Sequence, residues 1–405
     1  MSRKQVPTPS PPVPDSAPHP GRDAAPRPRH VSLLVDALHP RARRSDHPAS
    51  LAAALGALGV ETRVEPVAAG VLTRNAVTDA DGHPIDPASP PFDADARIAY
   101  DPFSPAAWLG ARLARRDGRP LLLVEPGWTG ARRLHERFLD GLGNRLWGRS
   151  VRAACGRLAA LDPLGEARAL ARGFLPGRVA LVPTGVDTRA FAPGLPSRAV
   201  ARHRLSGRLL LAVGPLEAGR GLDVLLAAFA RTVGQRPDWS LVIVGEGPLE
   251  RRLVATADRL GVSAAVHLLP WQSPSDLAGL MAASTLFAAP DEGDRSSGVQ
   301  VVRALACGLA VLVADRPRLA HLVRDGVDGR LVRAGDAAAW RDALLGAASA
   351  PDARARWARS ARERAVERHD WSQVAAAMLA LLCELESERG TPLSAPHTFR
   401  TRQPA

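Results

Sequence analysis

The stretch LLLAVGPLEAGRGLDVLLAAFA, Leu209–Ala230, decides the fold of this 405-residue chain. It begins with an uninterrupted apolar run, continues through a glycine-rich loop and ends in an apolar helical pattern. This order is typical of a buried parallel strand followed by a helix. Because the same alternation recurs before and after this stretch, the sequence predicts an α/β protein with open parallel sheets.

One polar segment interrupts the alternation and divides it into two halves. The pattern of each half predicts a doubly wound, Rossmann-like domain. Open sheets of this kind bind ligands at the carboxyl ends of their strands, so we expect a ligand in the cleft between the halves. The expected boundaries are 1–29 for a disordered Pro-rich lead, 30–187 for the N-terminal domain, 188–206 for a linker, 207–370 for the C-terminal domain, 371–388 for a crossover helix and 389–405 for a disordered tail.

The composition narrows the function classes. The net charge is +12, but the base is almost all arginine, in a chain rich in Ala, Gly and Pro. This is typical of a GC-rich coding bias, and no basic stripe with interleaved aromatics predicts nucleic-acid binding. The three cysteines form no CxxC pair, which excludes a typical zinc site and fits a reducing cytoplasm. No apolar run reaches the roughly 20 residues of a membrane span, and no secretory signal is expected.

Several segments, in order, carry a family resemblance. VPTGVDTRAFAP at 182–193 resembles the interdomain segment of glycosyltransferase family 4, retaining enzymes of the GT-B fold. Leu209–Ala230 resembles the first strand, loop and helix of the family's donor domain. The remaining matches are LVIVGEGPLERRL at 241–253, SPSDLAGLMAASTLFAAP at 273–290, ALACGLAVLVADRPRLAHLVRDGVDGRLVRAGD at 304–336 and HDWSQVAAAMLALL at 369–382, the last similar to a helix that crosses back onto the N-terminal domain.

The resemblance implies a hexosyltransferase that moves a sugar from a nucleotide diphosphate sugar to an acceptor hydroxyl with retention. Cationic side chains and a helix N-terminus can stabilise the departing diphosphate without metal. The absence of an Asp-x-Asp motif after a strand agrees with a metal-free site, and no cofactor is expected beyond the nucleotide sugar substrate. The acceptor stays open among a glycan, a lipid and a small molecule, and a bacterial, cytoplasmic enzyme is expected.

The loop after the first donor-domain strand supplies the first candidate residues. The resemblance implies that Gly214 lets the backbone approach the phosphates. Arg220, before Gly221, stands where the family has a phosphate-binding lysine, and it keeps the charge and adds a bidentate fork. Pro215 replaces a second expected cation. The alternative for Arg220 is a solvated surface arginine.

Two further candidates follow the next strands. Glu246, in VGEGPL, either faces the ligand or caps the following helix. Trp271, in LPWQSPSD, either stacks on the nucleotide base or packs at a strand end.

The segment DEGDRSSGVQVVR, 291–303, departs from the family. The family carries two glutamates here, whose places are taken by Arg295 and Arg303. Arginine only donates hydrogen bonds, so it cannot accept them from sugar or ribose hydroxyls. Either Asp294 serves the first position, or the arginines bind the diphosphate themselves. Four residues at the expected helix start either present N–H groups to an anion, with serine as a cap, or only cap a buried helix: Ser296, Ser297, Gly298 and Val299.

The N-terminal half departs as well. HPRARRSD at 39–46 replaces a glycine-rich loop, and Pro126 stands where the family has a histidine that positions or polarises the sugar. Glu125 either fills part of that role or is an ordinary loop carboxylate. A stripe of apolar residues with arginines around it either lies on an anionic membrane or faces the core: Leu134, Phe138, Leu142 and Leu146.

These departures leave alternatives to an active transferase. A GT-B protein that has lost catalysis and binds or regulates a partner transferase is the main one. A nucleotide-sugar epimerase or a phosphorylase-like enzyme is the other, and no specific residue favours it.

Overall fold

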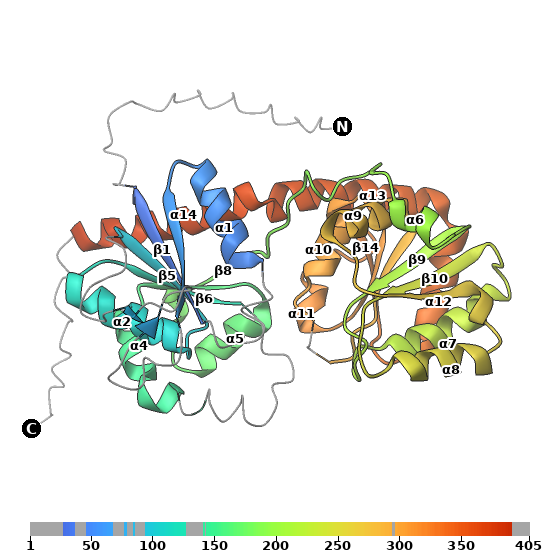
Figure 1. The fold of residues 1–405 in the computed structure, drawn as a ribbon, viewed down its shortest axis with the longest axis horizontal. Helices are drawn as coiled ribbons and strands as arrows, with labels where there is room; N and C mark the ends of the chain where they lie inside the picture. The colour runs from blue at the N-terminus through green and yellow to red at the C-terminus, as the bar shows by residue number, and fades with distance from the viewer. Residues whose placement is uncertain are drawn as a thin grey trace, which may run out of the picture.

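The computed structural model describes residues 27–36, 46–67, 77–78, 84–85, 94–126, 141, 143–293 and 296–390. In these residues the chain forms two α/β domains side by side, each built on a parallel six-stranded sheet (Figure 1). The expected disorder of the lead before residue 27 and of the tail after residue 390 lies outside the described residues.

The first domain has the strand order β2-β1-β5-β6-β7-β8, and the sheet reverses direction of growth between β1 and β5. Residues of α2, α4 and α5 cover one face of the sheet, and residues of α1 and α14 cover the other. The elements are β1 (His30–Asp36), α1 (His47–Ala57), β2 (Glu61–Val67), a two-stranded hairpin β3 (Val77–Thr78) and β4 (Pro84–Ile85), β5 (Ala96–Tyr100), α2 (Pro105–Asp117), β6 (Leu121–Glu125), α4 (Gly148–Ala154), β7 (Arg157–Ala160), α5 (Pro163–Ala171), a 3₁₀ turn (Pro176–Arg178) and β8 (Val179–Leu181).

The second domain has the order β11-β10-β9-β12-β13-β14, with its reversal between β9 and β12. The elements are α6 (Arg198–Arg202), β9 (Arg208–Val213), α7 (Leu222–Val233), β10 (Trp239–Val244), α8 (Glu250–Arg259), a 3₁₀ turn (Ser263–Ala265), β11 (Val266–Leu269), α9 (Pro274–Ala283), β12 (Leu286–Ala289), α10 (Val299–Ala306), β13 (Val311–Ala314), α11 (Pro317–Ala320), β14 (Gly329–Val332), α12 (Ala337–Ser349), α13 (Pro351–Arg364), a π-helical turn (Ala365–His369) and α14 (Trp371–Gly390).

The uninterrupted apolar runs are explained by burial on both faces of the second sheet. Along β9, Leu209 and Leu211 pack toward α9 and α10, whereas Leu210 and Ala212 pack toward α7, α8 and α12. Successive strand residues point to opposite faces, so a strand covered on both sides must be apolar at every position. The sequence-based prediction of a parallel, doubly wound α/β fold is therefore confirmed.

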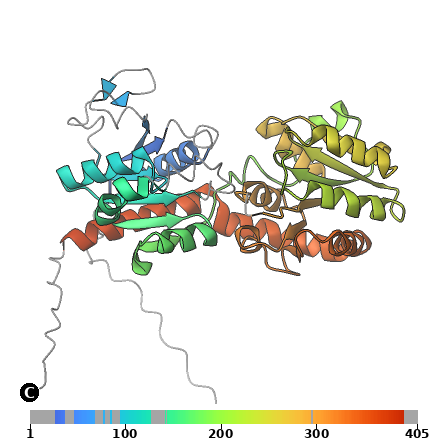
Figure 2. The ribbon, with the colours of Figure 1, turned by 90° about the horizontal axis from the view of Figure 1, so that it is seen from below.

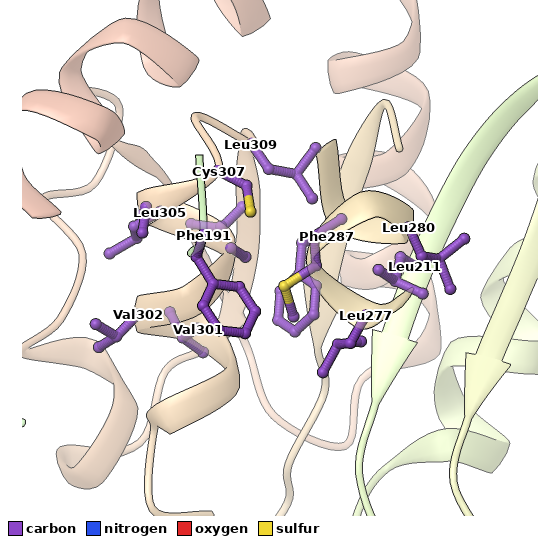
Figure 3. Packing of buried hydrophobic residues seen from close by; sticks show 14 of the residues in the cluster. Phe191, Leu211, Leu277, Leu280, Phe287, Val301, Val302, Leu305, Cys307 and Leu309 are labelled. Carbon is purple, nitrogen blue, oxygen red and sulfur yellow. The ribbon is translucent and has the colours of Figure 1, made fainter. Parts of the chain in front are cut away.

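The segment predicted to be a linker also packs against the second domain. Phe191 lies in the core with Phe287 of β12 and Val301 of α10 (Figure 3), and Ala199 and Leu205 are buried in the same cluster. Helix α6 within this segment contacts α9. The polarity of the segment reflects its outer face and hides these inward-facing residues.

The chain returns to the first domain at its end. Figure 2 shows α13 and α14 running along one side of both domains, and Val374, Ala375 and Met378 of α14 are buried in the first domain's core. At the passage between domains, Val186 N–H donates to His369 O at 2.7 Å and Trp371 N–H donates to Val186 O at 3.2 Å. The predicted crossover helix is confirmed, and two paired chain segments connect the domains.

Two helix predictions are wrong in extent. The residue pattern over 130–155 predicts one long helix, but the structure interrupts it at Trp147, whose backbone lies outside the helical region (φ −128°, ψ −4°), and α4 begins after it. Residues 130–140 and 142 of that prediction lie outside the described residues. The segment RPRLAHLVRDG, 316–326, also predicts a helix, but the structure limits it to the single turn α11.

Candidate functional site

The loops that leave β9 and β12 meet at the reversal point of the second sheet. Glu292 N–H and Gly293 N–H both donate to Gly219 O, at 3.1 and 3.2 Å. Gly221 has φ +66°, and a Cβ there would lie 2.0 Å from Pro290 O. Only glycine satisfies both this backbone conformation and this contact. Parallel sheets bind ligands at such reversal points, which makes these loops the candidate site.

Arg220 lies at the centre of this contact. Its Nη1 donates to Asp291 Oδ2 at 2.9 Å, and the two side chains are only 17% and 7% exposed. The alternative of a solvated surface arginine is therefore wrong. Nε of Arg220 is buried and makes no hydrogen bond to any residue that the structure describes. The guanidinium is thus anchored by one edge.

Gly214 differs from Gly221 in its surroundings. A Cβ on Gly214 would meet no described atom within 4 Å. The backbone N–H of Gly214 is used by Val244 O at 3.0 Å. The space beside Gly214 is open, which is compatible with the close approach of a ligand but does not require glycine.

Glu246 and Trp271 lie in contact with each other, near the loop that begins at Gly214. The backbone of Glu246 accepts from Leu216 N–H at 2.9 Å, and its Oε1 accepts from Trp271 N–H at 3.4 Å. Glu246 does not cap α8, which begins after Leu249 without a side-chain cap among the described residues. Trp271 is 44% exposed, so it is not packed away at the end of β11. The helix-cap alternative for Glu246 is therefore excluded, whereas the base-stacking role of Trp271 stays a prediction.

The start of α10 has no serine cap. The N-cap position belongs to Gly298, with φ +74°, and no described side chain bonds to the first turn. Ser296 Oγ instead accepts from Gly298 N–H at 3.3 Å, and Ser297 is exposed. The prediction of a serine cap is wrong because the left-handed Gly298 turns the chain before Val299. Two further candidates, Asp294 and Arg295, lie outside the described residues.

Arg303 is directed toward the first domain. Its Nη2 lies 3.7 Å from Asp46 Oδ2, next to the start of α1, and its guanidinium lies 4.9 Å from the centre of the Phe191 ring. Burial lowers the pKa of Arg303, and the Asp46 carboxylate partly offsets this. Among the described residues, Arg303, at the second position where the resemblance implies a glutamate, therefore contacts the first domain through Asp46.

Glu125 lies at the carboxyl end of β6 in the first domain. Its side chain is buried, and Arg168 Nη1 of α5 lies 3.7 Å from its Oε1. Pro126, which follows it, is buried as well. Glu125 is therefore a buried carboxylate with an arginine partner and not an exposed loop residue. The loop residues Arg41, Arg43 and Arg44 lie outside the described residues.

Sequence reasoning missed a buried ion pair between the domains. Asp162, directly after β7, accepts from Gly165 N–H at 2.8 Å and caps α5. Its other oxygen lies 3.5 Å from Nε of Arg318 on α11, and the side chains are 6% and 1% exposed. The pair places the carboxyl end of β7 against that of the second sheet. Nothing in the local sequence of either residue announces the other.

Asp101 is a second residue that the sequence did not reveal. It follows β5 at the reversal point of the first sheet, is buried, and has φ +59°. Phe103 N–H donates to its Oδ1 at 3.3 Å. A left-handed non-glycine residue costs of order 1–3 kcal/mol and is concentrated at functional positions. The only signal in the sequence was an aspartate after a predicted strand, and this pattern is too common to identify a functional residue.

The described residues were compared with what a metal site and a membrane span require. Within them, no three His, Cys, Asp or Glu side chains are grouped as a metal ion would require. In the same ranges, no helix combines the length and apolarity needed to cross a bilayer. Of the apolar stripe predicted over 134–146, only Leu146 is described, and it is exposed.

The second domain matches a known protein family. Residues 197–364 match the family model described as glycosyl transferases group 1. A D-inositol 3-phosphate glycosyltransferase of Mycobacterium tuberculosis is 36% identical over 221 residues, which cover 51% of this chain and 44% of that protein. The enzyme of the same name from Segniliparus rotundus is 35% identical over 185 residues, covering 44% and 40%. The chain therefore spans less than half of the curated relatives that it matches.

Solved structures resemble the whole fold. A glycosyltransferase of Rickettsia africae superposes with a TM-score of 0.68 at 13% identity, covering 88% of this chain and 98% of that one. HepE of Anabaena in complex with UDP gives 0.65 at 16% identity, covering 88% and 100%. Sucrose-phosphate synthase of Thermosynechococcus elongatus gives 0.66 at 19% identity, covering 89% and 100%. At these identities the likeness confirms the GT-B fold.

Proposed function

We propose that this protein is a glycosyltransferase that moves a sugar from a nucleotide diphosphate sugar to an acceptor hydroxyl group. The observation that carries the proposal is the Arg220–Gly221 corner, held against Pro290 and Asp291 at the reversal point of the second sheet. This corner lies within the 197–364 match to the glycosyl transferases group 1 model.

The reaction requires stabilisation of negative charge on the leaving diphosphate. Arg220 supplies a cation at the carboxyl end of β9, and the first turn of α10 adds backbone N–H groups and the positive end of its dipole. We expect the diphosphate to approach the Arg220 guanidinium from the exposed 17% of this side chain. Exposed Trp271, next to Glu246, offers a surface on which the nucleotide base stacks.

The finer features of the reaction are part of the proposal. We expect retention of the anomeric configuration, activity without a metal ion, and an acceptor bound by the first domain. Two of the relatives are named D-inositol 3-phosphate glycosyltransferase. Because the chain matches less than half of their length, a glycan, a lipid and a small polyol are all to be tested as acceptors. We expect the enzyme in the cytoplasm; peripheral membrane contact is a further possibility to test with anionic vesicles.

Calorimetry with UDP- and GDP-sugars tests the proposal first. Micromolar to millimolar binding of one donor to the wild-type protein is expected, and Arg220→Met should weaken it about 30-fold, as for a lost charge-assisted hydrogen bond. Turnover over the acceptor panel in the presence of a chelator then tests metal independence, and NMR of the product anomer tests retention. Absence of binding to every nucleotide sugar would overturn the proposal. Binding without turnover on any acceptor would assign the protein to the non-catalytic class.

A further inference from the structure

We propose that Asp291 is a positioning residue, which holds the Arg220 guanidinium in the orientation that meets the donor diphosphate. The inference rests on the proposed function, because it assigns a role within the same site. Asp291 stands in a different loop from Arg220, and the ion pair joins residues 71 positions apart. These loops leave the neighbouring strands β9 and β12.

The backbones on both sides of the ion pair are fixed to each other. Gly219, before Arg220, accepts from the N–H groups of Glu292 and Gly293, which follow Asp291. Gly221, after Arg220, packs against Pro290, which precedes Asp291. The two residues are therefore enclosed by contacts between their immediate neighbours, and the 2.9 Å Nη1–Oδ2 distance is set by the loop geometry.

A fixed arginine is a better anion ligand than a free one. The arginine side chain has many rotamers, and ordering it on binding weakens affinity. Asp291 occupies only one of the five N–H donors that a guanidinium carries. Nε is also buried and bonds to no described residue, while 17% of the side chain remains exposed. The carboxylate thus orders the side chain and leaves donors for an incoming phosphate oxygen.

Among the described residues, the other acidic side chains near these loops do not share this contact. Asp223, on the first turn of α7, is half exposed and lies 3.8 Å from Arg252. The pKa of Glu292 is raised because burial disfavours its charged form and because Asp223 and Asp291 lie close, although Arg316 acts in the opposite direction. Asp291 is therefore the carboxylate in contact with Arg220, and Asp223 provides a matched control of the same charge near the same loops.

Two physical roles of Asp291 give opposite results. If it orders Arg220, removing its charge disorders the guanidinium and weakens binding of a nucleoside diphosphate. If it only neutralises Arg220, removing its charge frees the cation and tightens binding. A double-mutant cycle also separates action through Arg220 from a general effect on the loop.

The experiment measures UDP affinity by calorimetry in wild type, Asp291→Asn, Arg220→Met and the double variant, with GDP and ADP used if wild type prefers another base. We expect Arg220→Met to weaken binding about 30-fold, as for a lost charge-assisted hydrogen bond. Asp291→Asn should weaken it roughly fivefold to tenfold, and the double variant should bind no more weakly than Arg220→Met. Asp223→Asn should stay within about twofold of wild type. Thermal unfolding of each variant accompanies the titrations.

The outcomes separate this inference from the proposed function. Unchanged or tighter UDP binding by Asp291→Asn overturns the positioning role, and so does equal weakening in the Arg220→Met background. Both results leave the proposed function in place, whereas failure of the wild-type protein to bind any nucleoside diphosphate removes that function itself. If Asp291→Asn does not fold, Asp291→Glu keeps the charge but shifts the carboxylate by one methylene. Weakened binding at wild-type stability then supports the role, and unchanged binding overturns it.

Discussion

The two domains share one architecture but hold the carboxyl ends of their strands by different means. In the second domain, glycines and backbone hydrogen bonds join the loops around the buried Arg220–Asp291 pair, as at Gly219 and Gly221. In the first, buried carboxylates stand at the ends of β5, β6 and β7, at Asp101, Glu125 and Asp162. Backbone contacts are encoded locally by glycine, whereas buried charges depend on partners elsewhere. The match to the glycosyl transferases group 1 model, residues 197–364, lies in the second domain.

Two ion pairs between the domains also differ from each other, because one is buried and the other is partly exposed. Arg318 and Asp162 form an ion pair that is almost fully buried. Arg303 is mostly buried, but its partner Asp46 is 79% exposed. A buried charge without its partner is strongly destabilising, whereas an exposed pair contributes little. The following predictions test this comparison, from the largest expected effect to the smallest.

Arg318→Met should have the largest effect on stability. It leaves Asp162 buried without its arginine, and the free energy of unfolding is expected to fall by about 3–5 kcal/mol. Chemical denaturation checks this value. The control is the double variant Arg318→Met/Asp162→Asn, in which asparagine still caps α5 and much of the stability returns. A single variant as stable as wild type would show that the pair does not hold the domains together.

Gly221→Ala should lower the free energy of unfolding by about 3 kcal/mol, from a left-handed backbone and a contact with Pro290 that no side chain permits. Gly214→Ala is the matched control, because a Cβ there meets no described atom within 4 Å. It should change stability by less than about 1 kcal/mol. Similar losses in the two variants would contradict the assignment of the loop contact to Gly221.

Acid should destabilise the first domain and its contact with α14. Burial lowers the pKa of both His47 and His369 to about 4 from 6.5. The folded protein therefore binds fewer protons than the unfolded chain below pH 6.5, and stability is lost as the pH falls from 6.5 toward 4. Each histidine contributes about 3 kcal/mol to this loss, because its pKa is about 2.5 lower in the folded protein than in the unfolded chain.

Melting temperatures measured between pH 7.5 and 4.5 check the acid effect. His47→Asn removes one titrating group next to Tyr100 and Trp371. Its stability should fall less steeply with acid than that of wild type, although it starts from a lower value. Parallel profiles for the two proteins would refute the role of His47.

Arg303→Met should have the smallest effect. Its partner is exposed and its contact with the Phe191 ring is modest, so we expect a loss of about 1 kcal/mol. Because the partner is exposed, the ion-pair part of this loss should shrink in 0.5 M salt. Denaturation of Arg303→Met and Arg318→Met at two salt concentrations sharpens the comparison. A loss from Arg303→Met as large as that from Arg318→Met would remove the distinction between the two pairs.

The sequence by itself determined the repeating strands and helices, because burial on two faces demands continuous apolar strands. The helix that returns to the first domain was predicted from a family resemblance, and the left-handed corner at Gly221 was seen only in the structure. The candidate site residues were selected by resemblance, but the sequence did not predict the residues with which they form hydrogen bonds and ion pairs. Ser296 shows the limit, since a serine before a helix is a typical cap and the left-handed Gly298 took that position instead.

Only the tertiary structure decided what the charged residues do. It paired Arg220 with Asp291, turned Arg303 toward Asp46 and buried Arg318 against Asp162. It also placed Phe191 of the polar connecting segment in the second domain's core. The physical reason is that an ion pair forms wherever packing brings two side chains within reach, and its partners can lie anywhere in the chain. In a sequence with so many arginines, the residue type alone does not distinguish a ligand-binding cation from one that joins two domains.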